Sequence, residues 1–228
     1  MSDIVTENDY FKDGLCMHCQ WAREVLQDFR YFHTETEGSW VNKDSQLQNK
    51  INEELKKQPL KYQQQIIESY SFDLHQFQNQ FPNIHRESLI ITIYNFLEKQ
   101  LNTLCKILSK YFENSVKLNE LNGKGVRRAF LYLSKIANLD STKFKNEKEY
   151  IINVNRLRNQ IVHNGGDLPQ NSNDPLNVFI ENNKYLYGSP NEQVSLDADF
   201  IYELVDTLTS FFEKLDCEIQ MFITKINS

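Results

Sequence analysis

The sequence predicts an all-α protein, a helical bundle of about five to seven helices. Only 7 glycines and 5 prolines occur in 228 residues, too few to separate many short strands by tight turns. Apolar residues instead recur at helical spacing along most of the chain. Because hydrophobic residues make up 40% of the chain and aromatic residues 12%, a core can be filled, and disorder throughout is excluded.

The sequence disfavours membrane and secreted proteins. No run approaches the roughly 18 apolar residues that a bilayer span needs, and the first residues lack the basic-then-apolar layout of an export signal. The four cysteines are therefore expected to be reduced thiols rather than a disulfide framework. We expect a soluble, cytoplasmic protein that binds no membrane.

Residues 1–80 are predicted to form an N-terminal helical extension. Apolar residues at helical spacing over residues 15–32 predict a first helix, which should end before the polar stretch at residues 34–39. The strongly polar segment 44–81 predicts two helices that meet near Pro59, because proline disrupts a helix interior.

Residues 81–228 are predicted to form the main bundle, packed with the extension as one unit. Segment 84–112 is the richest in aliphatic residues, and Pro82 just before it suits a helix start, so we expect the central core helix there. Further amphipathic helices are expected at residues 126–136, from about 146 to 164, and at 197–226.

The connection at residues 167–195 is long, polar and rich in proline. We expect a loop that holds a short β-hairpin, with strands at residues 178–180 and 184–187. Loops of this length in compact domains are often functional or mobile.

Charge is unevenly distributed along a chain whose net charge is −6. Residues 117–148 carry eight lysines and arginines against three acidic residues, whereas residues 197–218 are acidic. A polyanion is expected near the basic stretch, and the plain alternative is an ordinary solvated helix face.

The segment 150–166 departs from ordinary helix patterning. At about 100° per residue, its apolar residues form one arc, and Arg158 falls inside that arc. An unpaired buried guanidinium costs several kcal/mol, so Arg158 must be paired, reach an edge, or face a bound anion. The members of the arc are Ile151, Val154, Leu157, Ile161 and Val162.

A polar ladder borders this arginine. Asn155, Asn159 and His163 follow one another at intervals of four residues, with Arg156 one stripe further round. The alternative is purely structural, with Arg158 in an ion pair and His163 favoured at the helix end by the helix dipole.

The sequence Arg158-Asn159-x-x-x-His163, which ends a helix and runs into Asn164-Gly165-Gly166, resembles the Arg-x4-6-His signature of HEPN domains. That family consists of all-helical, usually dimeric bundles. It includes metal-independent endoribonucleases of toxin–antitoxin, phage-defence and CRISPR-linked systems. The resemblance covers roughly residues 84–228 and leaves residues 1–80 without a counterpart.

The resemblance implies roles for five residues. Arg158 and His163 would be catalytic, and Asn159, Asn164 and Arg156, the last at Arg-x6-His spacing, would support them. The implied reaction is attack by the ribose 2′-hydroxyl on the scissile phosphate, which needs neither a metal nor another cofactor and leaves a 2′,3′-cyclic phosphate and a 5′-hydroxyl. RNA would be the substrate, and two motifs would meet in a homodimer.

Two alternatives to a nuclease remain. A noncatalytic HEPN module would mediate dimerisation or bind a nucleotidyltransferase or antitoxin partner, and the net charge of −6 favours it because RNA affinity depends on phosphate neutralisation. A purely structural helical adaptor is the other.

The sequence predicts no metal site. Cys16-Met17-His18-Cys19 lacks the second ligand pair that a zinc site needs, so plain thiols are expected. His33, His75 and His85 are isolated in the sequence.

Overall fold

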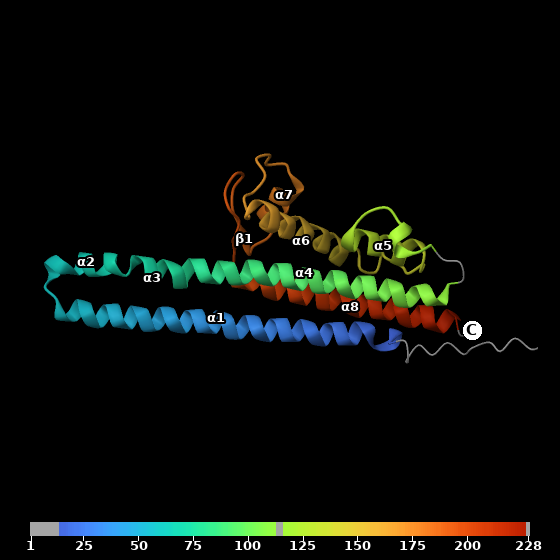
Figure 1. Ribbon diagram of the computed structural model, residues 1–228, viewed down its shortest axis with the longest axis horizontal. Coiled ribbons are helices and arrows are strands. Elements are labelled where there is room, and N and C mark those ends of the chain that lie inside the picture. The colour runs from blue at the N-terminus through green and yellow to red at the C-terminus, as the bar shows by residue number, and fades with distance from the viewer. Residues whose placement is uncertain (1–13, 113–115, 227–228) are drawn as a thin grey trace, which may run out of the picture. The chain divides into compact units, whose positions relative to one another are not determined.

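The computed structural model describes residues 14–112 and 116–226 and confirms the all-helical bundle (Figure 1). No helix in this part of the chain is both long and apolar enough to cross a membrane. The α-helices are α1 (His18–Lys57), α2 (Leu60–Ser69), α3 (Ser71–His75), α4 (Phe81–Leu108), α5 (Gly125–Lys135), α6 (Lys145–Asn164), α7 (Pro175–Glu181) and α8 (Ala198–Ile226). The short elements are η1 (Leu15–Met17), the π turn η2 (Gln76–Gln80), η3 (Ser109–Tyr111), η4 (Leu118–Glu120), β1 (Leu186–Tyr187) and β2 (Ser195–Leu196).

The chain divides into two compact units that interleave along the sequence. Helices α1, α4, α6 and α8 each contribute residues to both. Unit 1 comprises Met1–Gln27, Thr92–Leu157 and Leu204–Ser228, and unit 2 comprises Asp28–Ile91 and Arg158–Glu203.

Helix α1 corrects the prediction of a first helix that ends before residue 34. The helix continues through the polar stretch to Lys57. Gly38 costs only about 1 kcal/mol within a helix, and tertiary contacts of the same stretch outweigh that penalty. Glu37 forms an ion pair with Arg86 at 2.7 Å, and Trp40 packs on Phe81 with ring centroids 5.4 Å apart.

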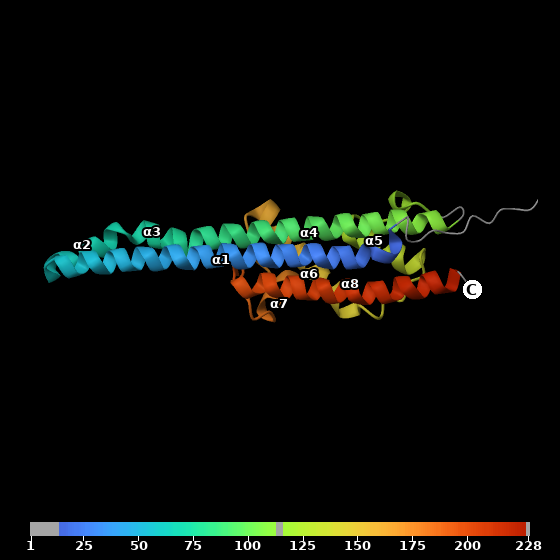
Figure 2. The same ribbon diagram turned by 90° about the horizontal axis from the view of Figure 1, so that it is seen from below.

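The predicted break near Pro59 is confirmed. Pro59 is extended, with ψ 146°, and precedes the first residue of α2. Within unit 2, α1 and the α2–α3 segment form a long hairpin and run side by side in both views (Figures 1 and 2). The Tyr70 hydroxyl donates to Glu54 Oε1 across this hairpin at 2.8 Å.

Helix α4 begins at Phe81, so Pro82 lies in its first turn, as predicted. The start of α4 is not a free helix end, because the π turn η2 lies immediately before it. The Phe81 N–H donates to the Gln76 carbonyl, five residues back. Because proline has no N–H to donate, a wider turn at this position absorbs the irregularity.

The connection at residues 167–195 holds the predicted small strand pair only in part. β1 pairs antiparallel with β2, and Leu186 lies opposite Leu196. Residues 178–180, predicted as a strand, belong instead to α7. Asp174 caps this helix by accepting from the Leu176 N–H at 2.8 Å, and Pro175 occupies the first helical position, where its missing N–H is harmless.

Unit 1 is organised around aromatic side chains. Phe211 of α8 is fully buried, and its ring meets Phe130 of α5 at 5.7 Å and Phe144 at 5.3 Å, both edge-on. Edge-to-face contacts of this kind add to the free energy that burial of the rings contributes.

A buried histidine in the same unit satisfies a helix carbonyl. His18 Nε2 donates to the Gln100 carbonyl at 3.1 Å. Burial lowers the pKa of His18 below its ordinary value of 6.5, although the bond to Gln100 acts in the opposite direction. The folded protein therefore holds His18 neutral under conditions that protonate it in the unfolded chain.

Phe211→Ala is expected to lower the free energy of unfolding by about 3–5 kcal/mol, because the lost ring leaves a cavity between Phe130 and Phe144. Urea unfolding followed by circular dichroism measures the change. Phe72→Ala, at a side chain that is 65% exposed, is the control and should change stability by less than about 0.5 kcal/mol. Equal losses for both variants would contradict this account of the core.

Acidification through pH 6.5 is expected to destabilise the protein in part through His18, because the unfolded chain then takes up a proton that the folded chain excludes. His18→Gln keeps a donor for the Gln100 carbonyl and removes the titrating group. Thermal melts at pH 7.5 and 5.5 should show a smaller loss in melting temperature for this variant than for the wild type. An unchanged loss would show that His18 does not contribute.

Candidate functional site

The predicted catalytic arginine is oriented by its neighbour. Arg158 is half-buried, and its Nη1 donates to Asn159 Oδ1 at 3.1 Å. Around a helix, Asn159 lies about 100° from Arg158, and His163 about 40° beyond Asn159. The bond therefore draws the guanidinium away from the apolar arc, toward the stripe that carries His163.

His163 and Asn164 are exposed at the end of α6, where the predicted glycine stop is confirmed. Gly165 and Gly166 adopt φ 62° and 88°, a left-handed conformation that favours glycine. The Gly166 N–H donates to the Gln160 carbonyl at 3.2 Å, which closes the last turn.

The segment before β2 ties down this helix end. Gln193 Nε2 donates to the Gly165 carbonyl at 2.9 Å, and the Val194 N–H donates to the Gly166 carbonyl at 3.0 Å. A Cβ added at Gly166 would meet Gln193 and Val194 at 3.4 Å, so the packing is close. The polar connection thus supports the candidate site.

The apolar arc around Arg158 is mostly buried within a single chain. Ile151, Val154, Leu157 and Ile161 are 7% exposed or less, whereas Val162 is 43% exposed and lies outside the packed surface. One chain therefore covers most of this arc without a second copy. The homodimer stays a prediction that the resemblance implies.

Arg156, the alternative motif arginine, has a different environment. It is half-buried, and its guanidinium donates to Asn153 Oδ1, one turn earlier on α6. The structure thus gives the two arginines of α6 separate asparagine partners.

A histidine cluster in unit 2 was missed by the sequence analysis, which treated His33 and His85 as isolated. His33 Nδ1 lies 3.1 Å from His85 Nε2, and the planes of the two rings are nearly parallel, with an angle of 10° between them. Glu37 Oε1 lies 4.0 Å from His33 Nδ1. The available signal was the spacing of four between His33 and Glu37 on one helix, but nothing in the sequence pairs them with a residue 52 positions from His33.

This cluster is partly buried and held by hydrogen bonds. His33 is fully buried, and its Nε2 donates to the Ala198 carbonyl at 2.9 Å. Burial lowers the pKa of both His33 and His85, so both rings are neutral at neutral pH. Arg86 donates to both oxygens of Glu37, at 2.8 and 2.7 Å, and to the Leu196 carbonyl at 2.6 Å.

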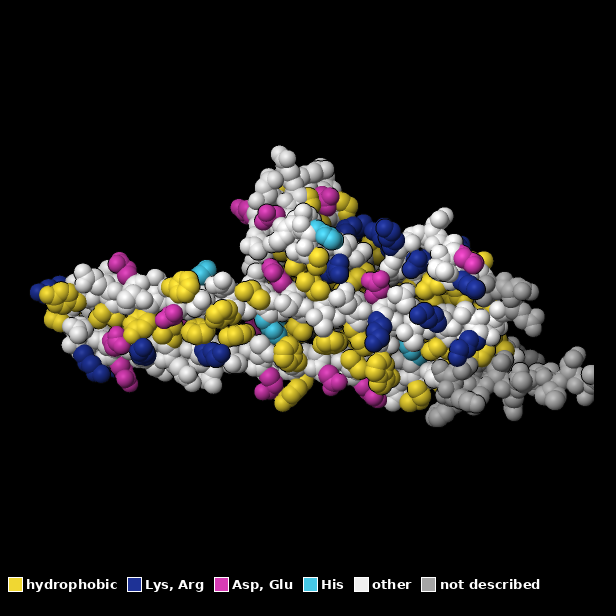
Figure 3. Space-filling model, viewed as in Figure 1, with side chains coloured by type: hydrophobic (Ala, Val, Ile, Leu, Met, Phe, Trp, Pro, Cys, Tyr) yellow, Lys and Arg dark blue, Asp and Glu magenta, His cyan; other side chains and the backbone are white. Residues whose placement is uncertain are grey.

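The predicted basic stretch contributes to a groove of about 530 Å³ in unit 1. Lys106, Lys117 and Arg128 line it together with Asn102 and Asn119. Figure 3 shows lysine and arginine side chains gathered on the surface over α5 and the adjoining part of unit 1. The groove therefore presents cationic and amide groups, which suit a phosphate-bearing ligand.

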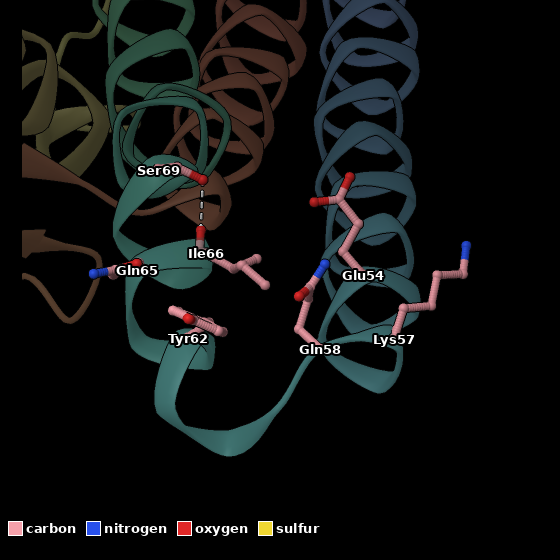
Figure 4. A pocket seen from close by; sticks show the side chains of 7 residues that line it. All are labelled: Glu54, Lys57, Gln58, Tyr62, Gln65, Ile66 and Ser69. Carbon is pink, nitrogen blue, oxygen red and sulfur yellow. Dashed lines mark hydrogen bonds between the residues drawn. The ribbon is translucent and has the colours of Figure 1, made fainter.

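A hollow of about 380 Å³ lies between the end of α1 and α2 (Figure 4). Its lining offers Glu54, Lys57 and amide side chains but no histidine or thiol, so it lacks a neutral-pH acid–base group. The four cysteines are free, as predicted, and burial raises the pKa of Cys19 and Cys105, which leaves those thiols protonated.

Comparison with protein-family models, curated proteins and solved structures finds no match to this chain.

Proposed function

We propose that the protein is a metal-independent endoribonuclease of the HEPN type, with its site at the end of α6. The observation that supports this function is the Arg158–Asn159 hydrogen bond at 3.1 Å beside the exposed His163. This bond orients the Arg158 guanidinium, which can bind phosphate, toward the side of α6 that carries the exposed His163.

The chemistry assigned to His163 is proton transfer. The ribose 2′-oxygen attacks the adjacent phosphorus, its proton passes to a base, and the bond from phosphorus to the 5′-oxygen breaks. The leaving 5′-oxygen takes up a proton, and the products are a 2′,3′-cyclic phosphate and a 5′-hydroxyl. Histidine gives or accepts a proton near neutral pH and can serve as the base or as the acid.

Arg158 binds and neutralises the scissile phosphate, and Asn159 positions its guanidinium. Arg158 and His163 lie about 140° apart around α6, so their backbone attachment points face different sides of the helix. The Asn159 bond brings the guanidinium back toward the side of His163. We also propose a homodimer in which the motifs of two chains meet, as the resemblance implies, with Asn164 beside the shared phosphate.

The basic groove of unit 1 supports RNA as the substrate. Three cationic side chains and two amides offer contacts to phosphate oxygens, which fix RNA without reading its sequence. DNA would not be cut, because the nucleophile is the 2′-hydroxyl.

In this proposal the enzyme is a cytoplasmic toxin or phage-defence effector, controlled by an antitoxin or a nucleotidyltransferase partner. The net charge of −6 instead favours the second candidate, a noncatalytic HEPN module in which Arg158 and His163 belong to a dimer or partner interface.

His163→Ala and Arg158→Ala are each expected to abolish RNA cleavage in EDTA, with a loss of about 10²- to 10⁴-fold for the histidine. Asn159→Ala should cost less, because it only releases the guanidinium, and Arg156→Ala should be intermediate. The measurement is cleavage of a labelled RNA, with detection of cyclic phosphate ends. The matched controls are His75→Ala and Lys56→Ala, at exposed residues outside the basic stretch, which should cut at wild-type rates.

Equal cleavage by the wild type and His163→Ala would place the activity elsewhere or in a contaminant. If the wild type cuts no RNA and Arg158→Ala disrupts the dimer in light scattering, the interaction module replaces the nuclease. A DNA strand and a 2′-O-methyl RNA of the same sequence should both stay intact.

Arg128→Ala is expected to weaken RNA binding and to reduce the slope of log affinity against log salt by about 1, because one phosphate contact is lost. Binding is measured between 50 and 200 mM salt on the inactive His163→Ala background. Lys56→Ala, an exposed lysine of the α1 end, is the control. An identical slope for Arg128→Ala and the control would exclude the groove from RNA binding.

A further inference from the structure

The cluster of His33, Glu37 and His85 lies within unit 2 and takes no part in the proposed ribonuclease site. Its ligating atoms lie within 4.8 Å of one another, and no other group of three such residues converges in this way in the described part of the chain. Two helices supply it: α1 carries His33 and Glu37 one turn apart, and α4 carries His85.

The hydrogen bonds define the tautomer of His33. The Ala198 carbonyl can only accept, so His33 Nε2 carries the proton in the 2.9 Å bond between them. Nδ1 of the neutral ring then carries a lone pair, and His85 Nε2 lies 3.1 Å from it. Histidines that bind a metal through one ring nitrogen usually donate the N–H of the other nitrogen to an acceptor such as a backbone carbonyl, which holds the ring in place.

We propose that His33 Nδ1, His85 Nε2 and Glu37 Oε1 bind a divalent transition-metal ion, with Zn²⁺ as the best match. Two imidazole nitrogens and one carboxylate oxygen, with a fourth position left for water, form a common zinc donor set. Two nitrogens bound tetrahedrally at about 2.05 Å lie about 3.3 Å apart, close to the 3.1 Å between the two rings. Glu37 must move toward both rings, because its Oε1 lies 4.0 Å from His33 Nδ1 and the three ligating atoms span up to 4.8 Å, against about 3.4 Å between neighbouring ligands of a tetrahedral zinc ion.

Binding requires a proton shift within His85 but no net loss of a proton. His85 Nε2 donates its hydrogen to His33 Nδ1 in the metal-free cluster, and on binding this proton moves to His85 Nδ1, which frees Nε2 for the metal. The ring stays neutral throughout.

Arg86 holds the Glu37 carboxylate in place and leaves room on it for the metal ion. A carboxylate offers about four lone-pair positions, and Arg86 uses one on each oxygen of Glu37. The second lone pair of Oε1 remains for the metal. Two aromatic rings pack edge-on against the histidines: the ring centroid of Phe32 lies 5.6 Å from that of His85, and that of Tyr202 lies 4.8 Å from that of His33.

The test adds Zn²⁺ to the full-length protein after EDTA treatment and dialysis. We expect about one zinc per chain by elemental analysis, and a melting temperature that rises by roughly 5 °C or more when free zinc is 100-fold above the dissociation constant. His85→Gln should lose both effects. Its amide N–H still donates to His33 Nδ1, so the variant separates a metal site from a plain hydrogen-bonded pair.

His75→Gln and Cys16→Ser are the matched controls, because each removes a metal-binding side chain elsewhere, and both should keep the zinc and the thermal shift. Circular dichroism of zinc-free His85→Gln checks that it folds. Zinc that binds the wild type and His85→Gln equally, or fails to bind the wild type at micromolar concentration, overturns the proposal. RNA cleavage in EDTA is scored separately, so neither result depends on the other.

Discussion

The ion pair between Arg86 and Glu37 is the interaction on which the arrangement of unit 2 depends. It joins α1 to α4 through two short bonds, and a third bond from Arg86 reaches the Leu196 carbonyl of β2. Both side chains are less than 20% exposed, so loss of either would leave a poorly hydrated charge, a change that typically costs 3–5 kcal/mol. The continuity of α1 through a polar, glycine-containing stretch follows from this requirement, because Glu37 lies in that stretch.

The same network extends to the end of α6. Arg86 holds β2 at Leu196, and Val194 and Gln193 just before it bond to Gly166 and Gly165. The residues that terminate the site helix are therefore fixed by a segment that is itself anchored to the α1–α4 ion pair. A helix end held in this way presents its exposed side chains without the entropy cost of ordering a loop.

Elements whose apolar residues repeat at helical spacing could be predicted from the sequence, as α5, α6 and α8 show. Elements that depend on contacts between residues distant in sequence could not be predicted. Helix α1 passes residue 34 because Glu37 meets Arg86, and no local pattern records that contact. Helix α7 did carry a local signal, Asp174 followed by Pro175, which was outweighed by the β-branched and aromatic residues after it. The α6 motif is contiguous and was visible, whereas the partners His33 and His85 lie 52 residues apart.

The packing of Trp40 on Phe81 makes its fluorescence different from that of the other tryptophan. The chain has only two tryptophans, and they fall in different units: Trp21 in unit 1, beside Phe96 at 6.3 Å, and Trp40 in unit 2, with Lys43 Nζ 4.6 Å from its ring centroid. Trp21 is 51% exposed, while Trp40 is half-buried, so the two indoles emit from surroundings of different polarity. Replacement of either one by phenylalanine leaves a single tryptophan, whose selectively excited emission reports on one unit alone. The protein thus contains its own pair of probes for whether its interleaved units unfold together or in succession.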